Sequence, residues 1–365
     1  MEPRAIEASA QDGSLLEVWV RDLSQVAPRA VGWLWPNRVP LGKVTLLAGD
    51  PGRGKSLLAL DMAARVSRGA PWPESGSGCA PLGRTILLSA EDDEADTIRP
   101  RFDALGGDAS RVCVLKDVDR YDIDRRGVFS LSHDVAGLEA VIGQWDDVRL
   151  VILDPVSAYM GGAESHNNAG IRSVLAPLQA LAERTGVAVV AISHLTKRAA
   201  ASVMYRTMGS LAFVSAARAA WVTVPDRATP GRTLLVPVKC NLASGVTGLA
   251  YRIVPHPENP ALPTVAWEPE PVALTAEEAM AAPSLTRREE AAAWLAGLLS
   301  GGPLPCEEVE RRAKEAGYSV ATLRRAKQEL GVEAHRLGFG ASCAWSLPTT
   351  HAAPIVDQPM QGGAQ

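Results

Sequence analysis

The sequence has few cysteines, and they form no recognisable set. Five cysteines occur among 365 residues, and no two have C-x-x-C spacing. An odd number of scattered cysteines argues against a disulfide framework and against a cysteine-based zinc site. The six histidines likewise lack metal-ligand spacing. We therefore expect reduced thiols and a cytoplasmic location.

Long apolar runs and a charge excess are missing as well. The longest apolar runs, such as Val187–Ile192, have the length of a strand, whereas a membrane helix needs about 20 apolar residues. The N-terminus lacks the apolar core of a signal peptide. Lysine and arginine number 37 and the acids 41. We expect no membrane contact, and any nucleic-acid contact must come from a local basic surface.

What the sequence does contain is an alternation of β-branched apolar runs with amphipathic stretches between residues 40 and 255. This alternation predicts an α/β fold with a mostly parallel sheet. The last three predicted strands follow one another closely, which favours an antiparallel addition. The predicted strands are Val44–Ala48, Thr85–Ser89, Val112–Leu115, Leu150–Leu153, Val187–Ile192, Ala219–Val224, Leu234–Val238 and Leu249–Val254. The predicted helices are Lys55–Ser67, Ala95–Leu105, Asp134–Gln144 and Ile171–Thr185.

A glycine-rich turn joins the first of these strands to the first helix. It fits the pattern G-x-x-x-x-G-K-[ST], which is typical of a loop that surrounds phosphate groups with backbone N–H donors. The following helix directs its positive end to the same place. We expect Lys55 to contact the β- and γ-phosphates and Ser56 to bind Mg²⁺. The predicted nucleotide-binding residues are Gly49, Asp50, Pro51, Gly52, Arg53, Gly54, Lys55 and Ser56.

Polar side chains end three further strands, where parallel sheets place their sites. Glu91 could deprotonate a water beside the γ-phosphate, with Asp92 as a second candidate. Asp154 follows four apolar residues and could hold Mg²⁺. His194 could sense the γ-phosphate. The alternatives are acids that merely favour a helix N-terminus and a histidine with a structural role.

Several cations follow the last of these strand ends. Arg198 and Arg206 lie in a small-residue segment that could contact a nucleic-acid backbone. Arg218 and Lys239 flank later strands and could act on the nucleotide of a neighbouring subunit. The alternative for each is a solvated surface charge.

These motifs resemble the RecA-like AAA-type ATPases related to the plasmid RepA replicative helicases. The resemblance rests on "LLAGDPGRGKS", "SAEDD", "VILDPVSAYMG", "ISHLTK" and "GSLAFVSAAR" in this order. It implies ATP and Mg²⁺ as cofactors, Glu91 as the hydrolytic carboxylate and His194 as phosphate sensor. It further implies Arg218 as a finger supplied in trans, within a homo-oligomeric, hexameric ring around single-stranded DNA. Phage- and mobile-element-type relatives with an added C-terminal unit are also similar.

The chain divides into five predicted parts. Residues 1–30 form an N-terminal segment, 31–255 the ATPase domain, 256–284 a Pro-rich acidic linker, and 349–365 a disordered tail. Residues 285–348 read as three helices and a hairpin, which predicts a winged helix-turn-helix. Its third helix would present Arg324, Arg325 and Lys327 to duplex DNA. The alternative is a winged helix used for protein contacts.

The sequence therefore favours an ATP-hydrolysing, DNA-associated motor, such as a replicative helicase or a related ATPase of a plasmid, phage or mobile element. One alternative is a DNA-bound regulatory switch in which ATP controls assembly and nothing is unwound. A second is a small-molecule phosphotransferase. The sequence shows no acceptor-binding lid, and Glu91 stands at a hydrolytic position, so the phosphotransferase is disfavoured.

Overall fold

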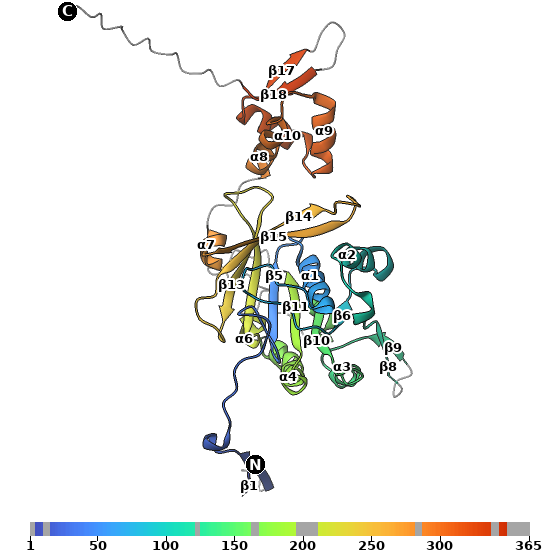
Figure 1. Cartoon of the computed structure of the whole chain (residues 1–365), viewed down its shortest axis with the longest axis vertical. Coiled ribbons are helices and arrows are strands. Elements are labelled where there is room, and N and C mark those ends of the chain that lie inside the picture. The colour runs from blue at the N-terminus through green and yellow to red at the C-terminus, as the bar shows by residue number, and fades with distance from the viewer. Residues whose placement is uncertain are drawn as a thin grey trace, which may run out of the picture.

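A nine-stranded sheet forms the centre of the protein (Figure 1). The computed structural model describes residues 4–9, 15–120, 125–161, 168–194, 211–281, 287–336 and 343–348. The strand order is β15-β14-β13-β12-β5-β11-β10-β6-β7. The strands from β12 to β7 are parallel, and β13, β14 and β15 extend the β12 side antiparallel. Their bounds are β5 Val44–Gly49, β6 Arg84–Ser89, β7 Val112–Val114, β10 Val148–Asp154, β11 Ala188–His194, β12 Ala219–Pro225, β13 Thr233–Cys240, β14 Gly248–Pro255 and β15 Pro263–Val272.

Helices cover both faces of this sheet, which explains why its strands are apolar throughout. Successive residues of β10 alternate between two cores: Val151 and Leu153 pack with α3 (Val135–Ile142) and α4 (Asn168–Thr185), while Ile152 packs with α1 (Lys55–Arg68). A third helix, α6 (Leu211–Ala216), lies with α3 and α4. The predicted α/β class with a parallel sheet and antiparallel additions is confirmed.

The predicted helix Ala95–Leu105 differs from the structure. Residues Glu94–Ile98 form a π-helical turn, and α2 follows as Arg99–Ala104. Pro100 lies in the first turn of α2, where a missing backbone N–H leaves no hydrogen bond unmade. The helical stretch is continuous from Glu94 to Ala104, and its first part is a π-helix rather than an α-helix.

The predicted linker 256–284 is wrong over β15, which pairs antiparallel with β14. Trp267 of β15 lies 5.5 Å edge-on to Trp35, and its Nε1 donates a 2.9 Å hydrogen bond to Asp61 of α1. The Pro-rich, acidic composition suits this position, because β15 is the edge strand and prolines are tolerated there. A short helix, α7 (Ala276–Ala281), follows.

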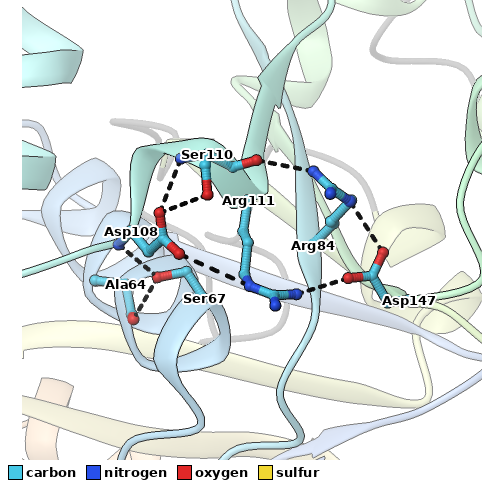
Figure 2. A network of polar contacts seen from close by, with 7 residues as sticks. All are labelled: Ala64, Ser67, Arg84, Asp108, Ser110, Arg111 and Asp147. Carbon is cyan, nitrogen blue, oxygen red and sulfur yellow. Dashed lines mark hydrogen bonds and ion pairs between the residues drawn. The ribbon is translucent and has the colours of Figure 1, made fainter.

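At the amino-terminal ends of β6, β7 and β10, a polar network holds the strands together (Figure 2). Arg84 and Arg111 both form ion pairs with Asp147, at 3.0 Å and 2.8 Å. Arg84 also donates to the carbonyl of Ser110, and the backbone N–H of Asp108 donates to Ser67 of α1. Ion pairs hold together this amino-terminal end of the parallel strands. The predicted site lies at the opposite, carboxyl-terminal end.

Residues 287–336 and 343–348 form a second cluster of helices with its own buried core. Ala291 and Leu295 pack there against Val309, Leu323 and Trp345. Its three strands have the order β16-β18-β17. Its elements are α8 Arg287–Leu299, β16 Leu304–Pro305, α9 Cys306–Glu315, α10 Val320–Glu329, β17 Glu333–Arg336 and β18 Cys343–Ser346. The remaining elements are β1 Arg4–Ser9, β2 Leu15–Val20, η1 Leu23–Gln25, β3 Trp33–Trp35, β4 Val39–Pro40, η3 Ala109–Arg111, β8 Asp117–Arg120, β9 Arg125–Val128 and η4 Val156–Tyr159.

Candidate nucleotide-binding site

The phosphate loop has the geometry that its sequence predicts. β5 ends at Gly49, and α1 begins at Lys55 after an N-cap at Gly54, whose φ is +75°. The first N–H groups of a helix have no partner within the helix, so those of α1 face the loop. Lys55 is buried, and its Nζ donates a 3.0 Å hydrogen bond to the carbonyl of Asp50. An anion in this loop would meet both the helix end and the Lys55 ammonium.

Two glycines are required here by close neighbours. A Cβ on Gly49 would come within 1.9 Å of Thr223 Oγ1, and one on Gly54 within 2.5 Å of Ile253 Cδ1. Tyr251 supports the same loop, because its hydroxyl donates a 2.6 Å hydrogen bond to the carbonyl of Arg53. Residues of β12 and β14 therefore fix the backbone of the loop. These supports carry no motif in the sequence, since they lie about 200 positions away from the loop.

Strand register brings the predicted polar residues to the same edge. His194, the last residue of β11, pairs with Gly49, and Asp154, the last residue of β10, pairs with Ser89 of β6. The N–H of Ala90 donates a 3.0 Å hydrogen bond to the Asp154 carbonyl, which places Glu91 just beyond it. The carboxyl-terminal ends of β6, β10 and β11 thus lie at the same end of the sheet as the phosphate loop.

Asp154 shows the strongest electrostatic perturbation at this edge. Its pKa is raised to about 6, chiefly by burial and to a lesser extent by the nearby charges of Asp92 and Glu91. A hydrogen bond from Ser56 and the charge of Lys55 act in the opposite direction. The Asp154 carboxylate lies close to the Ser56 hydroxyl and has too little positive charge around it. A carboxylate and a hydroxyl in such surroundings are suitable ligands for Mg²⁺. The donor set fits the predicted metal.

Lys55 and His194 share this electrostatic environment. Burial lowers the pKa of Lys55, while Asp154, Asp50 and Glu91 raise it. Burial also lowers the pKa of His194, and the charge of Lys55 lowers it further. The His194 Nδ1 atom is buried and has no hydrogen-bond partner among the described residues. His194 is therefore held neutral beside the position expected for the terminal phosphate.

The two neighbouring acids Glu91 and Asp92 have different surroundings. Asp92 forms a 3.2 Å ion pair with Arg101 of α2. Glu91 is exposed, and within the described part of the chain no ion pair to it is found. Glu91 is thus the acid with an unengaged carboxylate, as its predicted role requires.

Arg218 and Lys239 lie at the amino-terminal end of the parallel strands, opposite the end where the phosphate loop lies. Arg218 precedes β12 and is exposed, whereas Lys239 pairs with Ala220 of the same strand. The Lys239 Nζ donates hydrogen bonds to the carbonyls of Val214, Ser215 and Ala217, at 2.8–3.1 Å. All three ammonium donors of Lys239 are therefore used at the end of α6. Arg198 and Arg206 fall outside the described residues.

Of the three predicted DNA-binding cations, two are exposed on α10. Arg324 and Arg325 face away from the buried core. Lys327 is half-buried, and its Nζ lies 4.3 Å from the centroid of the Trp345 ring. The outward placement predicted for Lys327 is wrong, because its ammonium is attracted to the aromatic face. The Ser319 side chain accepts a hydrogen bond from Thr322 N at the start of α10, as its N-cap position predicts.

Comparison with known proteins agrees with this geometry. A family described as an AAA domain matches residues 9–200, more than half of the chain. The chain belongs to this AAA-domain family. Its mixed α/β core, with a mostly parallel sheet, is consistent with a RecA-like P-loop fold. No helix of the described ranges is long and apolar enough to cross a membrane.

Curated relatives of this AAA-domain protein include three DNA repair proteins RadA. RadA of Mycobacterium tuberculosis is 30% identical over 156 residues, which are 43% of this chain and 28% of RadA. RadA of Mycolicibacterium smegmatis is 31% identical over 166 residues, 43% and 29% of the two chains. RadA of Halalkalibacterium halodurans is 25% identical over 159 residues, 44% and 29%. The matched region thus spans less than a third of the length of these relatives.

Proposed function

We propose that this protein binds and hydrolyses ATP with Mg²⁺ at the carboxyl edge of its parallel sheet. The observation that carries the proposal is the convergence of the phosphate loop with Asp154, Glu91 and His194 through strand register. Lys55 would bind the β- and γ-phosphates, and Glu91 would accept a proton from the attacking water. His194 would contact the terminal phosphate.

The Mg²⁺ ion would be held by Ser56 and Asp154. When bound, it would neutralise charge that develops on the phosphoryl oxygens. The raised pKa of Asp154 supports this role, because a cation is what the buried carboxylate lacks. Ser56 and Asp154 line the same small cavity, so one ion could reach both side chains.

We further propose that the protein acts on DNA as a ring-forming motor, of the RepA-like helicase type or related to it. The relatives are named DNA repair proteins. The C-terminal order α8-β16-α9-α10-β17-β18, with the sheet β16-β18-β17, supports a winged helix-turn-helix that binds duplex DNA. Single-stranded DNA would pass through the channel of a hexameric homo-oligomer.

The test is ATP turnover by the full chain, with and without single-stranded DNA, compared with Lys55→Ala. We expect Mg²⁺-dependent turnover that single-stranded DNA stimulates, and loss of turnover in the variant because its phosphate-binding cation is gone. Turnover without stimulation or translocation would favour the DNA-bound regulatory switch. Wild-type rates in a folded Lys55→Ala protein would refute the site.

A further inference from the structure

A cavity of about 690 Å³ lies beside the phosphate loop. Gly52 and Arg53 of the loop line one side, together with the β12–β13 turn and Ile253 of β14. Glu290 and Trp294 of α8 line the other side. In Figure 1, α8 accordingly stands over the end of the sheet formed by β14 and β15. The cavity joins the AAA core to the C-terminal cluster, and its volume is in the range of small-molecule sites.

Strand order shows which end of a nucleotide would enter this cavity. Asp154 and Glu91 follow β10 and β6, which lie on one side of β5. The cavity lies on the other side, beyond β12. A nucleotide carries its terminal phosphate and its base at opposite ends. If the terminal phosphate faces Asp154 and Glu91, the base points toward the cavity.

The lining of the cavity suits a base better than a further phosphate. The Trp294 and Tyr318 rings lie 5.4 Å apart and provide flat apolar surface. Arg232 of the β12–β13 turn is neutralised by Asp226 at 2.6 Å, and Glu290 adds a negative charge that would repel phosphate. Near the loop, Arg53 Nε is buried and has no hydrogen-bond partner in the described ranges. Arg227 also lines the cavity, and its Nη2 donates a 3.1 Å hydrogen bond to the carbonyl of Met280. The flat aromatic surface of Trp294 and Tyr318 is therefore the feature that favours a base at the far end.

We propose that the purine base of the nucleotide occupies this cavity against Trp294, so that α8 forms the outer wall of the nucleotide site. The proposal rests on ATP binding at the phosphate loop. A Glu290 carboxylate could accept a hydrogen bond from the amino group of adenine. Because the nucleotide would contact both parts of the chain, its binding favours the arrangement in which the C-terminal cluster covers the core.

The test compares Mg²⁺-ATP with Mg²⁺-tripolyphosphate, which has no base, by calorimetry on the full chain. The main variant is Gly297→Leu, which places a side chain into the cavity from α8, where an added Cβ meets no atom within 4 Å. Its matched control is Gly137→Leu on α3, which has equally open surroundings. Both changes replace a helical glycine, which should stabilise each helix and preserve the fold.

We expect Gly297→Leu and Trp294→Ala to weaken ATP binding at least tenfold, with tripolyphosphate affinity changed less than twofold. Gly137→Leu should bind both ligands as the wild type does. Unchanged ATP affinity in a folded Gly297→Leu protein would overturn the base site alone. An equal loss of both ligands would also overturn it, because the effect would then act through the phosphates. A wild type that binds neither ligand would refute the proposed function itself.

Discussion

The backbone N–H of Arg218 donates a 3.0 Å hydrogen bond to the carbonyl of Val44, the first residue of β5. Gly49, where the phosphate loop begins, is the last residue of the same strand. At about 3.3 Å per residue, roughly 16 Å separate the backbone of Arg218 from this loop. Arg218 instead faces a cavity of about 330 Å³ that Lys43 and Arg172 also line. Glu183 lines the same cavity and forms a 2.7 Å ion pair with Lys43, which leaves Arg218 and Arg172 as the cations suited to an anion from outside the subunit.

The first prediction is that Arg218 completes the site of a neighbouring subunit. Arg218→Ala should bind ATP normally and hydrolyse it about 10³-fold more slowly, because a finger that stabilises transition-state charge is lost. Turnover per subunit should rise with protein concentration, and a mixture of Arg218→Ala with Glu91→Gln should recover part of the activity. Enzyme assays over a dilution series with parallel mass measurements check this.

Lys239 provides the control for that experiment. Its three hydrogen bonds hold the end of α6, so Lys239→Ala should lower the free energy of unfolding by about 1–2 kcal/mol.

Turnover per subunit that stays constant down to concentrations where only monomer exists would contradict a shared site.

The second prediction separates Glu91 from Asp92. Glu91→Gln should bind ATP and stall before hydrolysis, since the base that accepts the proton from water is removed. Asp92→Asn, which loses only the ion pair with Arg101, should retain most turnover. Single-turnover kinetics with bound ATP measure the difference. Rapid hydrolysis in Glu91→Gln would transfer the role to another residue.

The third prediction concerns the pH dependence of stability. The pKa of Asp154 is raised to about 6 in the native state, so the native protein binds a proton at higher pH than the unfolded chain does. The contribution of Asp154 to the free energy of unfolding therefore falls as the pH rises from about 4 to 6. Without nucleotide or Mg²⁺, Asp154→Asn should raise the free energy of unfolding at pH 8 by about 1–3 kcal/mol. The gain should vanish below pH 4.

Denaturant titration at several pH values checks this result, with exposed Asp146→Asn as the control that should show no such trend. The same Asp154→Asn protein should bind Mg²⁺-ATP more weakly, because a metal ligand is lost. An equal stability change at all pH values would show that burial of the carboxylate is not the cause.

The fourth prediction distinguishes the cations of α10. Replacing Arg324 and Arg325 with Ala should weaken duplex binding and lower the slope of log affinity against log salt by about 2. Lys327→Ala should mainly lower the stability of the C-terminal cluster, by about 1 kcal/mol, because its ammonium lies over Trp345. Fluorescence anisotropy at several salt concentrations measures the slope. A duplex affinity that both variants leave unchanged would favour protein contacts for this cluster.

The parts of the site that depend on local sequence could be predicted, and those that depend on distant packing could not. The phosphate loop needs one contiguous pattern, and Asp154 and His194 end apolar runs that reveal the strands before them. Thr223 and Tyr251 carry no such pattern, because their contacts with the loop join residues far apart in the chain. β15 could not be predicted because its prolines are typical of a linker. In the structure it is an edge strand, and Trp267 packs it against Trp35 of the core.

The prolines of β15 also restrict how the protein can associate. Pro263, Pro269 and Pro271 lie on the outermost strand of the sheet, and a proline has no N–H to offer a further strand. Regular backbone pairing of a further strand with β15 is therefore interrupted at these three positions. Glu270 adds a negative charge along the same strand, whereas Glu268 is paired with Arg232 at 2.8 Å and with Arg252 at 3.6 Å. Association through this side of the molecule is therefore expected to depend more on side-chain contacts than on a continuous backbone ladder.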